Sequence, residues 1–573
     1  MNFFSINAIE EGGELIHNDK YIHHKLEYEL DYWNKYTNEL GQIIYILGRP
    51  VVDVEKWNDF DNKASFISKI LLNEYNSKNI DNFCNDLNGA FSIIIFDKKI
   101  NNLVIITDKL GIFPLYGFEI DSIDKFHISS NLNLIKDSVD NKLTKDKISI
   151  AEFIKKGFIY HPNTLYNEIK TLNNASYYIY DLEKEAVNKK VYFKIKENSE
   201  DNFDYLVDQL SVALKNAIKR RTTKYYKKKV VFLSGGSDSR TILNNSYDNI
   251  EAITLYYKYN YEIEISERLT KTLNKKHNLI KRSENYYFDA FDKSIELNGG
   301  RSLPTDDHFI NIAKHASILQ YDSILTGCYA DWMFKGIALD RAKISLFGKL
   351  KLPLYKLITF NYDFFSKRTK VNEKYEKLIK AREDKIFKNK GDLFDNEVNR
   401  IFPLFQEETS STRLTLQQLF PWDTIFSDND IINIYMQIPV KYKINSEVYD
   451  AAVAKLTKNI DYIPHANKRH KIGLNKYLGA LLYLKSIVVN KIKRIFGMLK
   501  KDSLAGEGSW ISFQEYSRNE KIINLWNEVK KDESLYGDIL DNKDMDIDSI
   551  RKYDYKLIYK IITISKIFSQ IKK

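Results

Sequence analysis

Residues 229–239 read KVVFLSGGSDS, followed directly by Arg240. The run of β-branched and aromatic residues predicts a buried β-strand, and the two glycines after it predict a sharp turn. If a helix begins at Asp238 or Ser239, its free N–H groups and its dipole point at the space above the turn. The serine hydroxyls and the Asp238 carboxylate would then suit a pyrophosphate and a Mg²⁺ ion. The alternative is an ordinary turn between a strand and a helix, in which glycine and serine are common.

The chain after this stretch continues in the same pattern. From about residue 200, short apolar runs alternate with helical periodicity, which predicts a parallel sheet with helices on both faces. These runs are 230–233, 252–257 and 323–325. The helix that precedes them begins at Phe203, after a polar linker at 196–202. From about residue 340 the pattern is mostly helical.

The first 195 residues carry a different pattern, in which short strands follow one another. The predicted strands are 43–47, 91–96, 103–107 and 126–129, and a helix is expected at 65–75. Strands without regular intervening helices favour an antiparallel sheet in an α+β domain. We therefore expect two domains, residues 1–195 and 203–573.

The composition is typical of a folded globular protein. Of 573 residues, 43% are hydrophobic, 13% aromatic and 29% charged, and the net charge is +10. The charge comes from scattered lysines, so it favours anionic ligands over nucleic acid. Cys84 and Cys328 are too few for a disulfide framework or a cysteine zinc site, which favours a reducing compartment.

Two features of the sequence concern membranes. The N-terminus lacks a charged segment followed by an apolar one, and no apolar stretch reaches the ~18 residues that span a bilayer, so we expect a cytoplasmic protein. Residues 480–499 are apolar with interspersed basic residues, namely Lys485, Lys491, Lys493 and Arg494. Such a helix can lie on an anionic membrane surface. The interpretation that we prefer is a helix that packs on its domain with its lysines in water.

The string SGGSDS at 234–239 is neither of the common nucleotide loops, G-x-x-x-x-G-K-[ST] and G-x-G-x-x-G. It resembles the pyrophosphate loop of the ATP-pyrophosphatase superfamily, whose members split ATP between the α and β phosphates. Within that superfamily, the chain is most similar to the asparagine synthetase family. ILTGCYADWMFKG (324–336) stands where that family has S-G-E-G-x-D-E-L-F-G-G, and IPHANKRHKIG (463–473) stands where it has a late catalytic lysine.

The N-terminal half resembles the same family. LNGAFSIIIFD (87–97), TDKLGIFPLYGF (107–118) and HISSNLNLI (127–135) follow the order of motifs in the family's glutaminase-type domain. The resemblance implies an α/β protein that begins with an αββα Ntn-hydrolase-like sandwich, similar to glutamine amidotransferase type 2 domains. It also implies a second domain of the adenine-nucleotide α-hydrolase (ATP-pyrophosphatase) kind, with a parallel sheet and a helical C-terminal region.

The resemblance further implies a site for ATP and Mg²⁺. Asp238 and Asp331 match the two carboxylates that hold Mg²⁺ on pyrophosphate in the family, and Lys468, with Lys471 as the alternate, matches the late lysine. Tyr329 could act as the catalytic tyrosine of β-lactam synthetase if the loop shifts by one residue. The residues implied to contact ATP are Leu233, Ser234, Gly235, Gly236, Ser237, Asp238, Ser239, Thr326 and Gly327.

Several residues depart from the family pattern. Asn2 stands where glutamine-hydrolysing members expose a cysteine, and a carboxamide cannot form a thioester. The nearest hydroxyl, on Ser5, lies inside the predicted first strand. The sequence GRP at 48–50 occupies the neighbourhood of the family's Asn-Gly-Glu signature for glutamine. Cys328 replaces a glutamate of asparagine synthetases. We therefore predict a first domain without glutaminase activity, and no role follows for Arg240.

These observations predict an ATP-dependent amide-forming ligase. A substrate carboxylate would attack the α-phosphate to give an acyl-adenylate and pyrophosphate, and a nitrogen nucleophile would then displace AMP. The carboxylate would belong to a small molecule, a glycan or a peptide. The nitrogen would come from ammonia, from an ammonia-supplying partner or from an amine on the substrate. Two alternatives stay open: an enzyme that closes a macrolactam or β-lactam ring, and a nucleotide-binding protein whose catalysis has decayed.

Overall fold

A computed structural model of the protein describes residues 5–8, 14–17, 21–24, 35–52, 66–123, 125–139, 142–223, 226–247, 249–314, 318, 320–346, 350–358, 369–387, 392–406, 409–495, 509–531, 533–540 and 546–569. Asn2 lies outside these residues, so the prediction that this position lacks a nucleophile is not tested by the structure. No helix among the described residues is long and apolar enough to cross a bilayer.

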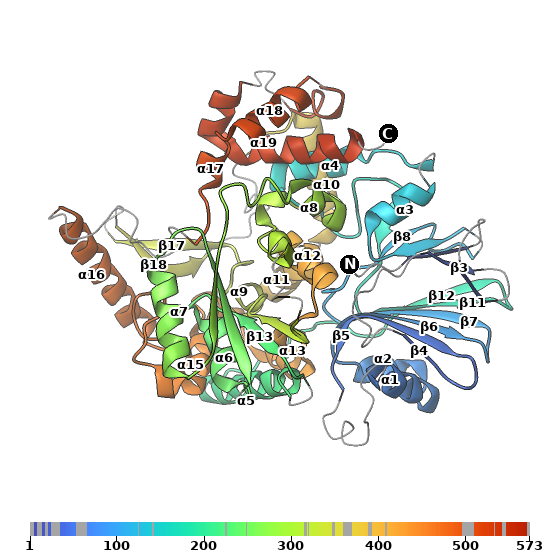
Figure 1. Ribbon diagram of the computed structural model, residues 1–573, viewed down its shortest axis with the longest axis horizontal. Helices are drawn as coiled ribbons and strands as arrows, with labels where there is room; N and C mark the ends of the chain where they lie inside the picture. Colours follow the sequence, from blue (N-terminus) through green and yellow to red (C-terminus); the bar gives the residue numbers. More distant parts are fainter. Residues whose placement is uncertain are drawn as a thin grey trace.

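Two antiparallel sheets of six strands each form the N-terminal part of the chain, on the right of Figure 1. Their strand orders are β10-β8-β9-β1-β3-β2 and β12-β11-β7-β6-β5-β4. The strands are β1 (Ser5–Ala8), β2 (Glu14–His17), β3 (Tyr21–His24), β4 (Lys35–Thr37), β5 (Ile43–Pro50), β6 (Gly89–Asp97), β7 (Asn102–Thr107), β8 (Tyr116–Phe118), β9 (His127–Ser129), β10 (Ile169–Thr171), β11 (Ser176–Asp181) and β12 (Ala186–Val191). Ser5 begins β1, as predicted.

Alternation along β6 explains how these sheets are layered. Ile94 and Phe96 face the first sheet, where Ile128 of β9 belongs to the same core. Ile93 and Ile95 face the other way, against α1 (Phe66–Ser77) and α2 (Ile80–Asp86). The outer face of the first sheet packs on α3 (Leu132–Val139) and α4 (Lys147–Lys156). The predicted αββα sandwich is confirmed.

A five-stranded parallel sheet in the order β15-β14-β13-β16-β19 forms the centre of the rest of the chain. The strands are β13 (Lys229–Phe232), β14 (Ile250–Tyr256), β15 (His277–Lys281), β16 (Ser323–Thr326) and β19 (Trp422–Thr424). Helix α5 (Phe203–Arg221) precedes the first of these strands, and the helices from β13 up to the turn after β16 are α6 (Ser237–Asn245), α7 (Tyr261–Thr272), α8 (Phe291–Asn298) and α9 (Ala330–Phe334). The strand order reverses between β13 and β16, which lie side by side. The predicted parallel sheet is therefore confirmed.

The region after β16 is mostly helical, as predicted, but it also contains the hairpin β17 (Arg341–Leu346) and β18 (Leu350–Leu357). Its helices are α10 (Glu373–Ile386), α11 (Leu393–Ile401), α12 (Ser411–Leu419), α13 (Asn429–Gln437), α14 (Val440–Lys443), α15 (Glu447–Leu456), α16 (Lys476–Ile495), α17 (Phe513–Tyr516), α18 (Glu520–Val529) and α19 (Ile547–Ser569). At the top of Figure 1, α18 and α19 share one core with α4 of the sandwich. The last hundred residues therefore join the two parts of the molecule.

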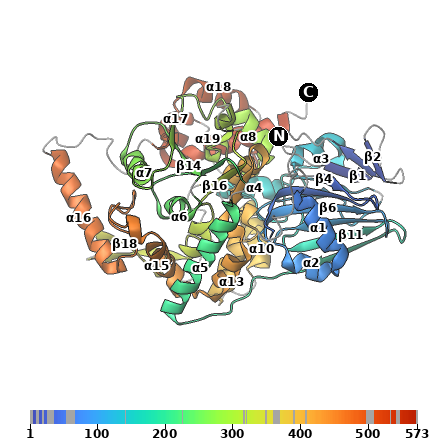
Figure 2. The ribbon, with the colours of Figure 1, turned by 60° about the horizontal axis from the view of Figure 1, so that its bottom comes forward.

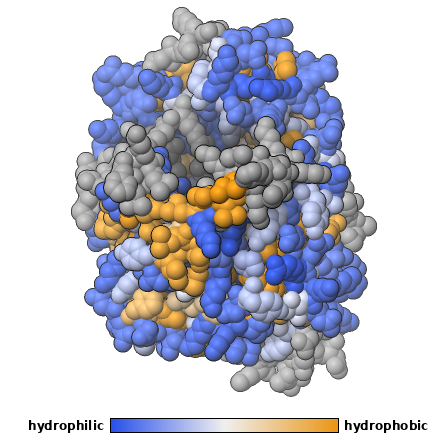
Figure 3. Space-filling view, turned by 90° about the vertical axis from the view of Figure 1, so that its left-hand side faces the viewer, coloured by the Kyte–Doolittle hydropathy of each residue, from blue (hydrophilic) through white to orange (hydrophobic). Residues whose placement is uncertain are grey.

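Helix α16 projects from the body of the molecule (Figure 2). Its exposed apolar residues are Leu478, Leu481, Leu482, Val488, Val489 and Ile492, each 36–64% exposed. Figure 3 views this side of the molecule and shows apolar side chains gathered on its surface. The start of the segment packs on its domain as we preferred, since Ala480 is buried and lines a cavity beside Leu354 of β18, whereas the apolar side chains just named face solvent. Contact with a membrane surface stays a prediction.

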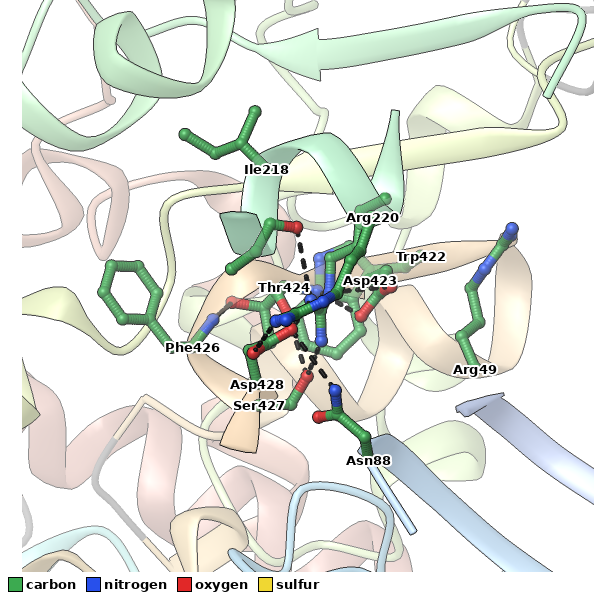
Figure 4. Close-up of polar contacts among 12 residues, drawn as sticks. Arg49, Asn88, Ile218, Arg220, Trp422, Asp423, Thr424, Phe426, Ser427 and Asp428 are labelled. Carbon is green, nitrogen blue, oxygen red and sulfur yellow. Dashed lines mark hydrogen bonds and ion pairs between the residues drawn. The ribbon is translucent and has the colours of Figure 1, made fainter. Parts of the chain in front are cut away.

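A buried ion network ties α5 to the end of the parallel sheet (Figure 4). Arg221, 2% exposed at the end of α5, lies 2.8 Å from Asp428 Oδ2 and 3.1 Å from Asp423 Oδ2. Asp423 belongs to β19, and Asp428 caps α13 by accepting the N–H of Asp430. Burial lowers the pKa of the Arg221 guanidinium, but the two carboxylates outweigh burial and raise this pKa above its usual value.

The N-terminal sandwich reaches the same network. Asn88 donates its amide to Asp428 Oδ2 at 3.4 Å and accepts the N–H of Asn429 at 2.9 Å. Arg49, the arginine of the GRP sequence, donates to the backbone carbonyls that precede β16 and β19, at 2.8 and 3.0 Å. The side chain of Arg49 therefore holds the two parts of the molecule together.

Replacing Arg221 by methionine tests this junction. The variant leaves Asp423 and Asp428 buried without their cation, a loss that costs on the order of 3–5 kcal/mol. We expect a lower midpoint of urea unfolding, followed by tryptophan fluorescence at pH 7. The control is Lys441→Met, which breaks an exposed ion pair with Asp201 and should leave the midpoint unchanged. Equal midpoints for Arg221→Met and the unmodified chain would contradict the role given to this network.

Candidate active site

The turn after β13 has the strand-turn-helix geometry that the sequence predicted. Gly235 has a φ of +65°, and a Cβ at this residue would lie 3.1–3.2 Å from the side chains of Ile265 and Ala466. Helix α6 begins at Ser237, one residue earlier than predicted, and no side chain caps it. Its first N–H groups therefore face the turn, as an anion site requires. Ser234 N donates to Ser239 Oγ at 3.1 Å, which closes the turn.

Arg240 explains why this turn keeps its shape. It is 1% exposed, and its guanidinium donates to the carbonyls of Gly235 (2.8 Å) and Gly236 (3.0 Å). It also donates to the carbonyls of Ile463 (2.8 Å) and Pro464 (2.9 Å). Burial lowers the pKa of Arg240 to about 10, so the side chain stays charged at neutral pH. Arg240 thus fixes the glycine turn against the segment that carries Lys468.

The second predicted loop follows β16 and touches the first. A Cβ on Gly327 would lie 2.5 Å from Asp238 Cβ, so only glycine fits there. Thr326 is buried and accepts the indole N–H of Trp422 at 2.9 Å. Leu233, at the end of the first strand, is also a buried core residue. The structure therefore brings residues 233–239 and 326–327 together.

Lys335 lies between the two predicted metal ligands. Its Nζ is 2.8 Å from a carboxylate oxygen of Asp238 and 2.8 Å from Asp331 Oδ1. Tyr449 donates its hydroxyl to Asp238 Oδ1 at 2.8 Å. Lys335 holds the pKa of Asp331 below its usual value. Burial opposes the charge of Lys335, but Asp238 and Asp331 raise the pKa of the ammonium above its usual value.

This arrangement does not fit a Mg²⁺ ion shared by the two aspartates. Mg²⁺ requires an octahedron of oxygen atoms at about 2.0–2.1 Å. The point at which Asp238 and Asp331 converge is already taken by an ammonium within hydrogen-bond distance of both. No cluster of three or more His, Cys, Asp or Glu residues suited to a metal ion occurs in the part of the chain that the structure describes.

Tyr329 and Cys328 follow Gly327 directly. Tyr329 has a φ of +82°, a conformation that favours glycine, and the family pattern has glycine at this position. The backbone therefore fits the alignment without a one-residue shift, and Cys328 keeps the place of the family's glutamate. The Tyr329 side chain is buried, with its ring against Trp422 and Arg413, and burial raises its pKa. Burial also raises the pKa of the Cys328 thiol.

The two candidate lysines differ in their surroundings. Lys468 forms an ion pair with Asp450, the residue that follows Tyr449 on α15. Lys471 pairs with Asp461 at 2.8 Å and is about half exposed. His465 is buried, and its Nδ1 accepts the N–H groups of residues 467 and 468 at 3.0 and 3.1 Å. Of the two lysines, Lys468 is the one that forms an ion pair with α15.

Lys468 lines a cavity of about 590 Å³. The walls come from the hairpin β17–β18, the start of α15, the segment 467–475 and the start of α16. Its charged residues are Arg341, Lys343, Lys468, Lys476, Glu447 and Asp450. Four of these side chains are basic and two are acidic, so the cavity suits an anionic molecule.

Comparisons with known proteins match parts of the chain. The model of a glutamine amidotransferase domain matches residues 63–193. Putative asparagine synthetase (glutamine-hydrolyzing) 2 of Methanocaldococcus jannaschii is 27% identical over 200 residues, which cover 33% of this chain and 36% of that protein. Asparagine synthetase (glutamine-hydrolyzing) 3 of Bacillus subtilis is 27% identical over 203 residues, which cover 35% of this chain and 32% of that protein. The matches thus span about a third of the length of these relatives.

The chain is thus similar to a glutamine amidotransferase domain over residues 63–193, and to asparagine synthetases over about a third of its length. Solved structures add little to this conclusion. Glutamine phosphoribosylpyrophosphate amidotransferase from B. subtilis, complexed with ADP and GMP, aligns with a TM-score of 0.22 at 12% identity and covers 48% of this chain and 59% of its own. The NH3-dependent NAD synthetase from Campylobacter jejuni aligns with a TM-score of 0.17 at 15% identity and covers 24% of this chain and 61% of its own.

Reasoning from sequence missed three residues of this site, namely Lys335, Tyr449 and Asp450. Lys335 follows Asp331 by four residues, a spacing at which opposite charges meet on a helix, so it could have been found. Tyr449 and Asp450 lie on α15, far along the chain from the glycine turn. No local signal marks them, because only the packing of α15 against α6 brings Tyr449 to Asp238.

His465 makes the turn that holds Lys468 sensitive to acid. Burial, with Lys468, Arg240 and Lys335 nearby, holds the pKa of His465 well below its usual value. The unfolded chain therefore binds the proton first, and stability falls by about 1.4 kcal/mol for each pH unit below about 6.5. In His465→Asn, an amide oxygen replaces Nδ1 as the acceptor and does not titrate. We expect this variant to lose less thermal stability than the unmodified chain between pH 7.5 and 5.5. Equal losses in the two proteins would contradict this prediction.

Proposed function

We propose that this protein is an ATP-dependent ligase that forms an amide through an acyl-adenylate. The substrate carboxylate oxygen attacks the α-phosphorus of ATP, and the bond to pyrophosphate breaks. A nitrogen nucleophile then attacks the acyl carbon, loses a proton and displaces AMP. The family relationship and the two loops of the site support this proposal.

The observation that carries the proposal is the position of the glycine turn at the point where the strand order reverses. In open parallel sheets, ligands bind outside the carboxyl ends of the strands at this point. Here the turns after β13 and β16 flank it, and Gly327 lets them come into contact at Asp238. The uncapped start of α6, with Ser234 beside it, offers N–H and hydroxyl donors to a pyrophosphate.

Lys468 is well placed to act on the substrate side of the site. It lines the cavity, while residue 466 of the same segment donates its N–H to Gly235 O at 3.3 Å. A lysine ammonium there would offset the charge that develops on the α-phosphate and on the tetrahedral intermediate. The excess of basic side chains in the cavity supports an acid as the substrate.

Ammonia or an amine, rather than glutamine, is the nitrogen source that we propose. Asn2 cannot serve as a thiol nucleophile, and Arg49 of the GRP sequence donates to two backbone carbonyls of the parallel-sheet part. Both features favour a sandwich that supports the second part of the molecule rather than one that hydrolyses glutamine.

A nucleotide-binding protein without adenylation is the competing function. The observation that favours it is the Lys335 ammonium between the two aspartates. Pyrophosphate exchange separates the two functions, because only an adenylating enzyme returns labelled pyrophosphate to ATP.

The first test is exchange of labelled pyrophosphate into ATP with pools of small, sugar and peptide acids. Gly236 has an extended backbone, so Gly236→Leu should fold, but its side chain would cover the start of α6. We expect exchange to fall at least about 100-fold in this variant, because the phosphate loses its N–H donors. Gly236→Ala is the graded control, since its methyl would lie 3.3 Å from Ser234 Oγ. Exchange at full rate in Gly236→Leu would contradict the proposed phosphate site, and no exchange with any pool would contradict adenylation.

The second test concerns the nitrogen source. With an acid that supports exchange, ammonium chloride should support amide formation, and its effect should rise with pH as free ammonia increases. Glutamine at the same concentration should add no product beyond the blank. Glutamine-dependent product, with release of glutamate in equal amount, would show an active glutaminase and contradict this part of the proposal.

A further inference from the structure

The Lys335 ammonium has the surroundings of a bound cation. Its Nζ contacts the Asp238 carboxylate and Asp331 Oδ1 at 2.8 Å, and Ser237 Oγ at 3.2 Å. These three oxygen partners match the three N–H bonds of an ammonium. The ring of Tyr449 lies below it, with 5.2 Å between Nζ and the ring centroid.

The backbone around Lys335 fixes the ammonium in this position. Lys335 ends α9, and its carbonyl accepts a hydrogen bond from Arg341 at 2.9 Å. The next residue, Gly336, has a φ of +59° and turns the chain away. Side chains of Lys335 and Asp238 are each only 18% exposed. A cation tethered in this way competes with ions in solution at an effective concentration of order mM or more.

The residue type at this position matters for the charge of the site. The family pattern S-G-E-G-x-D-E-L-F-G-G has glycine where this chain has Lys335. A glycine leaves the space between the two aspartates open, whereas the lysine fills it with a permanent positive charge. Two carboxylates this close to one ammonium leave the cluster with one net negative charge, so there is little attraction left for a divalent ion.

We propose that Lys335 is the built-in cation of this site, so that Asp238 and Asp331 hold its ammonium in place of a divalent metal ion. The chain therefore does not bind a metal ion at these two carboxylates. The absence of a metal ion at these carboxylates is the first consequence. The second consequence, that the ammonium faces the phosphates of a bound nucleotide, rests on the proposed function.

Titration with Mn²⁺, followed by electron paramagnetic resonance without nucleotide, tests the first consequence. The unmodified chain and Asp331→Asn should show the same weak background of Mn²⁺ binding. Lys335→Ala should gain one site at least about tenfold tighter, because two carboxylates then face an open space. The double variant Lys335→Ala, Asp331→Asn should lose the gained site. Lys441→Ala, which removes a surface lysine paired with Asp201, should gain none.

Two results would overturn the proposal. One is a Mn²⁺ site in the unmodified chain that Asp331→Asn removes, since this would show that the ammonium moves aside for metal. Comparing the unmodified chain with Asp331→Asn requires a substitution only at Asp331, whose side chain is about half exposed. This comparison therefore tests the proposal even if Lys335→Ala does not fold. The other is a folded Lys335→Ala protein with no gained site.

Nucleotide binding separates this inference from the proposed function. Calorimetry with ATP in the presence of EDTA should give an affinity within about threefold of that in Mg²⁺, because the ammonium is part of the chain. ATP that binds only with Mg²⁺ would contradict the second consequence. A chain that binds no ATP under either condition would contradict the proposed function and leave the Mn²⁺ result in force.

Discussion

The arrangement of the whole molecule depends on the buried carboxylate of Asp428. A charge without solvent must be paired, and Asp428 is paired with Arg220 and Arg221 while it also caps α13. The same carboxylate accepts a hydrogen bond from Asn88 of the sandwich. One acidic side chain thus contacts the end of α5, the start of α13 and the N-terminal sandwich.

Close approach of backbone is the second constraint, and it acts at the site itself. Gly235 lets the turn pass between Ile265 and Ala466, and Gly327 brings the second loop against Asp238. The carbonyls of the turn point inward and accept hydrogen bonds from Arg240. The other side of the turn is therefore left to the N–H groups at the start of α6. The polarity of the turn, with donors outward, follows from one arginine behind it.

Reasoning from sequence was sufficient where the signal was local. The run KVVFLSGGSDS predicted β13, the turn and the start of α6 to within one residue, and the apolar, β-branched run at 91–96 predicted most of β6. It could not predict the hydrogen bond from Tyr449 to Asp238, because this contact forms only when two helices far apart in the sequence pack together. Nor could it predict that α18 and α19 share a core with α4, because an amphipathic pattern shows which face of a helix is buried but not which element packs on it. The hairpin β17–β18 was missed within a region whose overall pattern is helical.

Arg240 has a mechanical consequence for the cavity. Because it bonds to the carbonyls of residues 235–236 and 463–464, Arg240 joins the glycine turn to the segment whose next residues, Asn467 and Lys468, line the cavity. Another wall of the cavity is the hairpin β17–β18, whose strands pair only with each other among the described residues. Asn445 holds the hairpin by hydrogen bonds to the backbone of Tyr355. If the cavity holds the proposed substrate, we expect a larger molecule to displace the hairpin rather than to change the spacing between the glycine turn and residues 463–464.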